Sequence, residues 1–113
     1  MIRLALAFGL LASLSGVALA ADDKPAAPAG ASPAQLAAAG KQIFTGGAGC
    51  GGCHTLAAAG AKGQVGPNLD ELKPDAATVK KAVETGPSVM PAGLLKGADL
   101  DQVAQYVADN AGK

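Results

Sequence analysis

Two cysteines, one histidine and one methionine carry most of the chemistry that this sequence offers. The cysteines and the histidine form the pentapeptide CGGCH at residues 50–54, and the chain contains no other Cys or His. On a turn of helix, thiols three residues apart lie on the same side, so Cys50 and Cys53 can each add to a vinyl group of one haem. The imidazole of His54 can then reach the iron. The pentapeptide therefore predicts one covalently attached haem c, with His54 as an axial ligand.

The same Cys spacing also occurs in redox-active dithiols, which gives the main alternative for this motif. A dithiol of the thioredoxin type expects a strand before the motif and a helix after it, within a βαβ pattern. No stretch of this chain alternates polar and apolar residues with a period of two. A Cys50–Cys53 disulfide beside an incidental histidine remains the alternative to haem attachment.

Met90 is the candidate for the other axial position of the iron. Met1 falls in the expected leader, so Met90 is the only methionine of the mature chain. It lies in the irregular segment GPSVMPAG at residues 86–93, where Pro91 favours an extended backbone at Met90. Such a loop can place a side chain against a haem face. The alternative is that Met90 fills a gap in the core, the commoner role of methionine.

The composition also favours a cofactor. The chain has 113 residues, of which 50% are hydrophobic but only 3% are aromatic. A single domain of this size needs bulky side chains to build a core, and a porphyrin would supply that bulk. Nine basic residues balance nine acidic ones, so no basic surface suggests a nucleic acid as partner.

The N-terminal residues have the features of an export signal. A positive start, an apolar run and the small residues Ala18-Leu19-Ala20 predict a signal peptide at residues 1–20. Residues 21–31 form a flexible lead rich in Pro and Ala, and residues 32–113 form the domain. We expect export to the periplasm without stable membrane insertion after cleavage. The alternatives are a thylakoid lumen, or membrane anchoring if the signal stays uncleaved.

The rest of the chain predicts an all-α fold of about four short helices. Ser32, Pro33 and Gln35 form a capping box that begins the first helix, which Gly46-Gly47 ends. Its apolar face would comprise Leu36, Gly40, Ile43 and Phe44. The other helices are expected at residues 69–73, 76–85 behind Asp75, and about 100–110 behind Asp99. The small residues 57–63 suggest a plain surface loop.

With these motifs, residues 32–113 resemble the class I c-type cytochromes, the small soluble monohaem kind. GKQIF at 40–44 is similar to the family's first helix, and LDQVAQYV at 100–107 to its last, with Tyr106 at their crossing. GPNL at 66–69 resembles the segment in which a proline carbonyl accepts the N–H of the ligand imidazole. The resemblance implies that Pro67 orients His54 from outside the ligand shell. It also places Met90 at the sixth ligand position.

One departure concerns the haem propionates, which the family often binds through a Trp or Tyr from the middle of the chain. This chain has none there. Gln64, Asn68 or a lysine are the candidate substitutes, and the sequence does not choose among them.

An iron with two protein ligands has no position left for a substrate, so we expect a soluble electron carrier that cycles between ferrous and ferric iron, and not an enzyme. A five-coordinate haem sensor or ligand-binding protein is the alternative. A peroxidase-like enzyme would need distal acid–base groups, and the mature chain has no second His and no Arg.

We expect a monomer that meets its redox partners transiently, whether the donor and acceptor are membrane-bound or soluble. The expected contact is the exposed haem edge, with a rim formed by Ala48, residues 57–59, Val89, Ala92 and Leu94. Nearby lysines that could steer an acidic partner are Lys62, Lys73, Lys80, Lys81 and Lys96.

Overall fold

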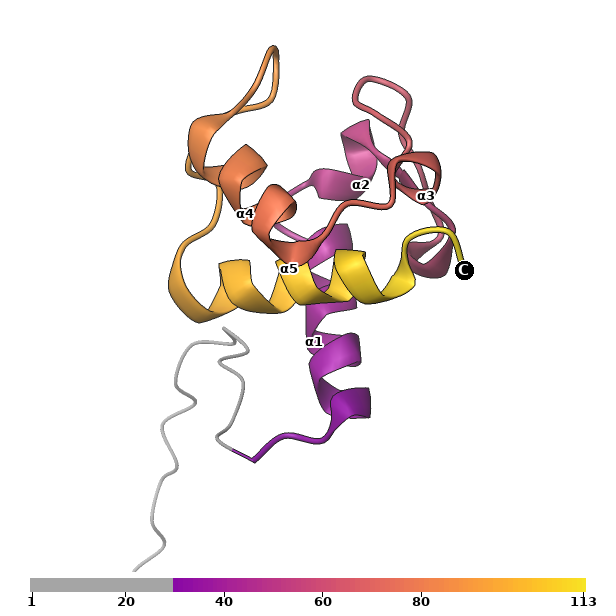
Figure 1. Ribbon diagram of the computed structural model, residues 1–113, viewed down its shortest axis with the longest axis vertical. Helices are drawn as coiled ribbons and strands as arrows, with labels where there is room; N and C mark the ends of the chain where they lie inside the picture. Colours follow the sequence, from indigo (N-terminus) through magenta and orange to yellow (C-terminus); the bar gives the residue numbers. More distant parts are fainter. Residues whose placement is uncertain (1–29) are drawn as a thin grey trace, which may run out of the picture.

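The computed structural model describes residues 30–113, a mostly helical domain (Figure 1). Its elements in chain order are α1 (Pro33–Thr45), α2 (Cys50–Cys53), β1 (Thr55–Leu56), the 3₁₀ helix η1 (Ala57–Ala59), β2 (Ala61–Lys62), α3 (Leu69–Leu72), α4 (Ala76–Thr85) and α5 (Gly97–Asn110). The expected signal at residues 1–20 lies outside the described residues, as does the lead at 21–31 apart from its last two. Both stay predictions.

Helix α1 begins with the capping box that the sequence predicts. The Gln35 amide N–H donates to Ser32 Oγ at 3.3 Å, and the Ser32 N–H donates to Gln35 Oε1 at 2.8 Å. The helix ends at Thr45 before Gly46. The predicted apolar face is correct at Gly40, Ile43 and Phe44 but wrong at Leu36, which is 40% exposed because the first turns of α1 extend beyond the domain.

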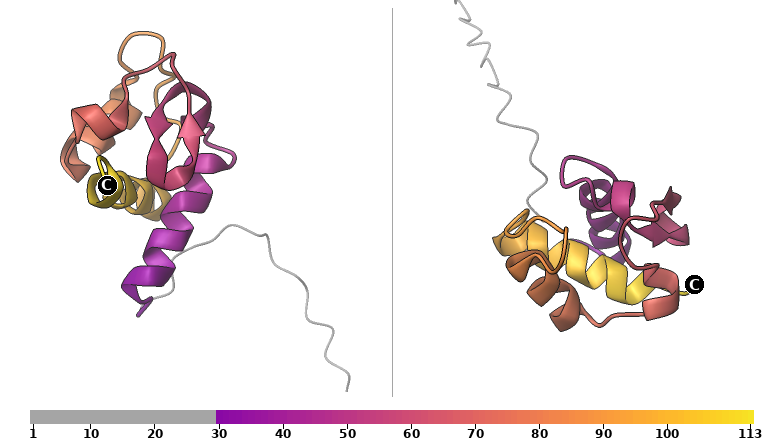
Figure 2. Two further views of the ribbon diagram at one scale, coloured as in Figure 1. Left: turned by 90° about the vertical axis from the view of Figure 1, so that its right-hand side faces the viewer. Right: turned by 90° about the horizontal axis from the view of Figure 1, so that it is seen from above.

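Helix α5 crosses α1 (Figures 1 and 2), and the two helices approach each other closely at Gly40. A Cβ atom at Gly40 would meet Tyr106 Cβ, would lie 2.9 Å from Tyr106 Cγ and would lie 3.0 Å from the Gln102 carbonyl oxygen. The rings of Phe44 and Tyr106 pack one turn further along, with centroids 6.4 Å apart. The crossing depends on the missing side chain at Gly40.

Helix α4 packs on α5 and follows the prediction, whereas α5 begins earlier than predicted. The Asp75 carboxylate caps α4 by accepting the Thr78 N–H at 2.7 Å, and an ion pair joins Lys80 to Asp101 of α5. Helix α5 starts at Gly97, so the prediction of Asp99 as its N-cap is wrong. Asp99 lies in the first turn, where a carboxylate is also favourable to the exposed N–H groups. Between residues 30 and 113, no helix has the length and apolar character needed to cross a membrane.

Residues 55–62 form a small hairpin, so the prediction of a plain surface loop at 57–63 is wrong. Thr55 pairs with Lys62 and Leu56 with Ala61 in two antiparallel strands joined by η1. Leu56 is fully buried, and Ala59 and Ala61 belong to the core. Small side chains were expected to lack the bulk to pack, but here the backbone comes close enough for methyl groups to fill the space. The fold nevertheless remains the predicted all-α type, with little strand.

We predict that Gly40→Ala destabilises the domain. The new methyl group must separate α1 from α5, and the overpacking cost of about 1–3 kcal/mol exceeds the gain of about 1 kcal/mol in helix propensity. Denaturant unfolding of the haem-loaded protein, followed by circular dichroism, measures the difference. Gly47→Ala is the control, since nothing lies within 4 Å of its Cβ position. Equal stability of the two variants would contradict the close crossing.

We also predict that Asp75→Ala lowers stability more at neutral pH than at acidic pH. The hydrogen bonds from the Thr78 side chain and backbone hold the pKa of Asp75 below its ordinary value. A depressed folded-state pKa stabilises the protein above the unfolded pKa, near 4, and this contribution is lost as the pH falls through the folded pKa. The difference between thermal melts of wild type and variant should therefore be largest at about pH 7 and smaller near pH 2. A difference that is independent of pH would show that the charge contributes nothing.

Candidate functional site

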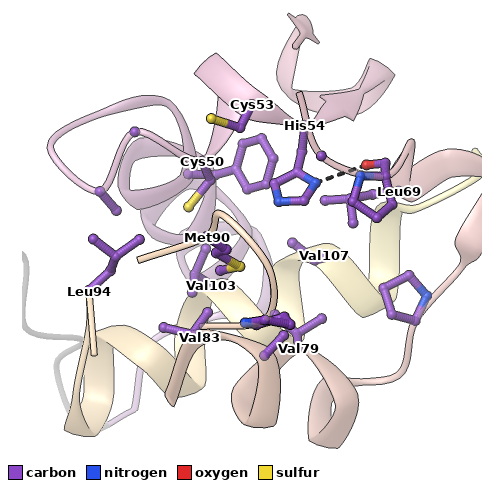
Figure 3. Close-up of a pocket in the computed structure, with 18 of the residues that line it drawn as sticks. Cys50, Cys53, His54, Leu69, Val79, Val83, Met90, Leu94, Val103 and Val107 are labelled. Atoms are coloured by element: carbon purple, nitrogen blue, oxygen red, sulfur yellow. Dashed lines mark hydrogen bonds between the residues drawn. The ribbon is translucent and has the colours of Figure 1, made fainter. Parts of the chain in front are cut away.

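A cavity of about 610 Å³ opens between α2, α4, α5 and the loops around them (Figure 3). Its volume lies in the usual range for small-molecule and cofactor sites, about 300–1,000 Å³. The wall is mostly apolar; its buried and half-buried members include Phe44, Cys50, His54, Leu69, Val79, Ala82, Val83, Met90, Val103 and Val107. The predicted site residues Cys50, Cys53, His54, Pro67 and Met90 all line this one cavity.

The short helix α2 presents the two thiols. It begins after Gly49, whose left-handed backbone (φ 68°) turns the chain, and the His54 N–H closes it by donating to the Cys50 carbonyl at 2.9 Å. Cys50 is half-buried against the core and Cys53 is exposed, and both thiols are free. The turn therefore brings both sulfurs to the same wall, as the sequence spacing predicts.

Burial raises the pKa of the Cys50 thiol, and the neighbouring Cys53 raises it further. A nucleophilic cysteine of a redox dithiol needs the opposite, a depressed pKa that makes thiolate available at neutral pH. The environment of Cys50 thus counts against the dithiol alternative.

His54 is fixed in one tautomer by a hydrogen bond to Pro67. Its Nδ1 lies 2.9 Å from the Pro67 carbonyl oxygen. A carbonyl only accepts, so Nδ1 carries the proton and Nε2 keeps its lone pair for a metal. Figure 3 shows this bond as a dashed line, with the imidazole directed into the cavity.

Gly66 lies directly against the His54 ring, a contact that was not predicted from the sequence. A Cβ at Gly66 would meet His54 Cε1, 2.7 Å from Nδ1 and 2.9 Å from Nε2. The Gly66 N–H also donates to the Cys53 carbonyl at 2.7 Å. The only sequence signal was the glycine before Pro67.

Met90 enters the cavity from the loop that joins α4 to α5. Its N–H donates to the Pro87 carbonyl at 3.1 Å, and the Gly93 N–H donates to the Val83 carbonyl at 2.7 Å, which ties the end of the loop to α4. At Gly86 a Cβ would meet backbone atoms, 2.6 Å from the Met90 carbonyl oxygen. The loop is thus held at both ends, and the Met90 side chain is half-buried against the core.

The mouth of the cavity differs in part from the predicted rim. Ala48, Val89 and Leu94 line it, as expected. The expectation is wrong for Ala92 and residues 57–59, which lie away from the cavity; Ala59 is buried in the hairpin. Val65, which is 68% exposed, and Leu72, which is 57% exposed, also line the cavity and were not predicted. Both are apolar residues within otherwise polar segments. This isolated apolar character is the only feature of the sequence that could have indicated their place at the mouth.

The polar candidates lie elsewhere or are already engaged. Asn68 caps α3, accepting the Asp70 N–H at 3.0 Å and donating to Glu71 at 3.2 Å. Gln64 is exposed and is not part of the cavity wall, and Lys80 pairs with Asp101.

The donors around the cavity suit an iron that brings its own equatorial ligands. In the described part of the chain, no group of three or more His, Cys, Asp or Glu side chains could hold a metal ion. One imidazole nitrogen and one thioether are instead the axial donors that haem iron takes in c-type cytochromes. Two thiols in the wall and the apolar lining complete the fit to a covalently attached haem.

Comparisons with known proteins find similarity to c-type cytochromes. The family model described as "Cytochrome C oxidase, cbb3-type, subunit III" matches residues 35–107, a range that contains all five candidate site residues. The solved structure of the c-type cytochrome SorU from Sinorhizobium meliloti is 49% identical, with a TM-score of 0.64, and the match covers 69% of this chain and 93% of that one. No curated protein matches significantly.

We predict that Gly66→Ala displaces the His54 imidazole, although residue 66 lies outside the CGGCH motif. The methyl group would overlap the ring, break its bond to Pro67 and lower the free energy of unfolding by about 1–3 kcal/mol. The imidazole N–H signal in the NMR spectrum of the ferrous protein reports the bond. Gly52→Ala, inside the motif, is the control, because its Cβ position has no neighbour within 4 Å. Equal effects of both changes would contradict the contact.

Proposed function

The chain belongs to the c-type cytochrome family, and we propose that it is a soluble carrier of single electrons with His54 and Met90 as the axial ligands of its haem. As a small c-type cytochrome it carries covalently bound haem c. When bound, the haem supplies an iron that alternates between the ferrous and ferric states. The observation that carries the proposal is that His54 and Met90 line the same cavity from two separate segments of the chain.

Cys50 and Cys53 hold the cofactor in the proposal. Each thiol adds across one vinyl group and so forms a thioether. Covalent attachment matters in a domain this small, because an open cavity alone would retain the group weakly. Phe44, Val103 and Val107 then pack against it from α1 and α5.

His54 binds the iron through Nε2, since its Nδ1–H is committed to the Pro67 carbonyl. The hydrogen bond fixes the ring orientation and increases the electron donation of the imidazole to the metal. Pro67 therefore acts on the iron through His54.

Met90 would supply the second protein ligand of the iron through its thioether sulfur. Its thioether favours ferrous iron and raises the reduction potential. With both axial positions held by side chains, no position is left for a substrate, which favours electron transfer over catalysis. The loop contacts at Gly86 and Gly93 hold the segment that carries Met90 and would limit its movement when the iron changes oxidation state.

The mouth of the cavity is the proposed contact with redox partners. Exposed apolar side chains surround it, among them Val65, Leu72, Val89 and Leu94. A small apolar contact suits a transient encounter, in which the electron carrier must leave as readily as it arrives. We propose a monomer exported to the periplasm, with a signal peptide at 1–20, a lead at 21–31 and the haem domain at 32–113.

The first test is Met90→Ala. Removing the thioether opens the sixth position, so the ferrous variant should bind carbon monoxide readily and its reduction potential should fall. The wild type should bind carbon monoxide poorly under the same conditions. Visible spectra with and without carbon monoxide, and a redox titration, measure both effects.

Val89→Ala is the matched control, since this neighbour in the same loop is 76% exposed and should leave both properties unchanged. If wild type and Met90→Ala bind carbon monoxide equally well, Met90 is a packing residue. A five-coordinate sensor would then be the better account.

A further inference from the structure

Asp70 joins three segments of the chain that are distant in sequence. Its Oδ2 accepts the Ala57 N–H at 2.8 Å, and its Oδ1 accepts the Gly112 N–H at 2.8 Å. The first bond reaches the start of η1, and the second reaches the end of the chain beyond α5.

The bond from Asp70 to Ala57 runs beside the bond from His54 to Pro67. Both link residues 13 apart, so the segment 54–57 is fastened to the segment 67–70 at each end. The second segment is stiff, because Asn68 caps α3 by accepting the Asp70 N–H. The first is stiff because it contains β1 and the start of η1. The second hydrogen bond restricts the relative rotation of the two segments that a single bond would allow.

We propose that Asp70 is a positioning residue for the proximal ligand: its bond to the Ala57 N–H holds the Pro67 carbonyl against the Nδ1–H of His54. The proposal rests on the proposed function, in which His54 binds the iron through Nε2. Asp70 itself does not line the cavity, so it acts through the backbone between Pro67 and its own carboxylate.

A carboxylate suits this position better than a neutral side chain. It accepts two backbone N–H groups at once, whereas an amide would turn a donor toward one of them. Hydrogen bonds to a charged acceptor are also about twice as strong as neutral ones. The Gly112 and Ala57 N–H groups hold the pKa of Asp70 below its ordinary value, so the side chain is ionised at neutral pH.

Loss of the hydrogen bond between the Ala57 N–H and Asp70 should change the reduction potential of the iron. The hydrogen bond to Pro67 increases electron donation by the imidazole, which favours the ferric state. If the two segments separate, the bond weakens, the ferric state loses part of its stabilisation and the reduction potential rises. The His54 Nδ1–H should also exchange faster with water.

The decisive variant is Ala57→Pro, which removes the N–H donor and leaves the Asp70 charge in place. Proline fits here, because Ala57 is the first residue of η1, is exposed, and follows Leu56 in an extended conformation (φ −151°, ψ 104°). Asp70→Ala removes the acceptor instead. The control is Asp75→Ala, which removes a comparable capping carboxylate from α4.

The measurements are made on the haem-loaded protein: a redox titration, and the exchange rate of the His54 Nδ1–H by NMR in the ferrous state. Ala57→Pro and Asp70→Ala should both raise the reduction potential. Both should also accelerate the exchange of the His54 Nδ1–H by about five- to tenfold, as expected for the loss of one hydrogen bond. Asp75→Ala should change neither quantity.

The proposal is overturned if the reduction potential and the exchange rate both stay at the wild-type values in Ala57→Pro or in Asp70→Ala. It is also overturned if Asp70→Ala raises the reduction potential but Ala57→Pro does not, because the rise would then come from the lost Asp70 charge and not from the lost hydrogen bond. It is overturned as well if Asp75→Ala raises the potential. Failure of the proposed function looks different, because it appears in the wild type as ready binding of carbon monoxide by the ferrous protein.

Discussion

The close crossing of α1 and α5 at Gly40 is the constraint on which the other elements depend. It brings Phe44 from the end of α1 beside Val103 and Val107 of α5, which together form one wall of the cavity. Since α2 follows α1 after a short turn, the CGGCH pentapeptide comes to the edge of that wall. Helix α4 packs on α5 and supplies the facing wall, from which the Met90 loop begins.

The two proposed axial ligands are held by different means. Around His54 the restraint is a set of hydrogen bonds between the segments 53–57 and 66–70, including those to Pro67 and Asp70. Around Met90 it is the close backbone contact at Gly86 together with the hydrogen bonds that the Met90 and Gly93 N–H groups donate. Both sides are therefore sensitive to added bulk, at Gly66 and at Gly86, and the histidine side is also sensitive to the loss of polar groups.

The features that could be predicted from the sequence are mostly those that depend on interactions between residues close together in the chain. The cap at Ser32, the cap at Asp75 and the CGGCH turn all lie within a few residues, and the structure contains each of them. Met90 followed by elimination, and Pro67 followed from a family resemblance. The capping partners are neighbours in the chain, and Met90 is unique in the expected mature chain, whereas Pro67 lies 13 residues from His54 and was predicted only through the resemblance.

The features that the sequence could not predict depend on distant partners. The bonds of Asp70 reach 13 and 42 residues along the chain, and no local pattern marks them. The burial of Ala59 likewise depends on how closely the hairpin approaches the core, as does the contact of Gly66 with the His54 ring. Small residues are ambiguous in a sequence, because the same methyl group or hydrogen suits either an open loop or a tight contact.

The projecting start of α1 determines how this domain can be attached to something else. Of this helix only Phe44, near its end, lines the cavity, and residues 32–38 are exposed (Figure 1). At 1.5 Å per residue, the first turn lies about 16 Å from Phe44 along the helix axis. Any segment joined in front of α1, whether a natural tether, a fused domain or a linker to an electrode, is therefore attached on the side away from the cavity mouth. A tethered form would therefore present the mouth of the cavity outward. The same surface would then be available to partners in the diffusing and in the immobilised protein.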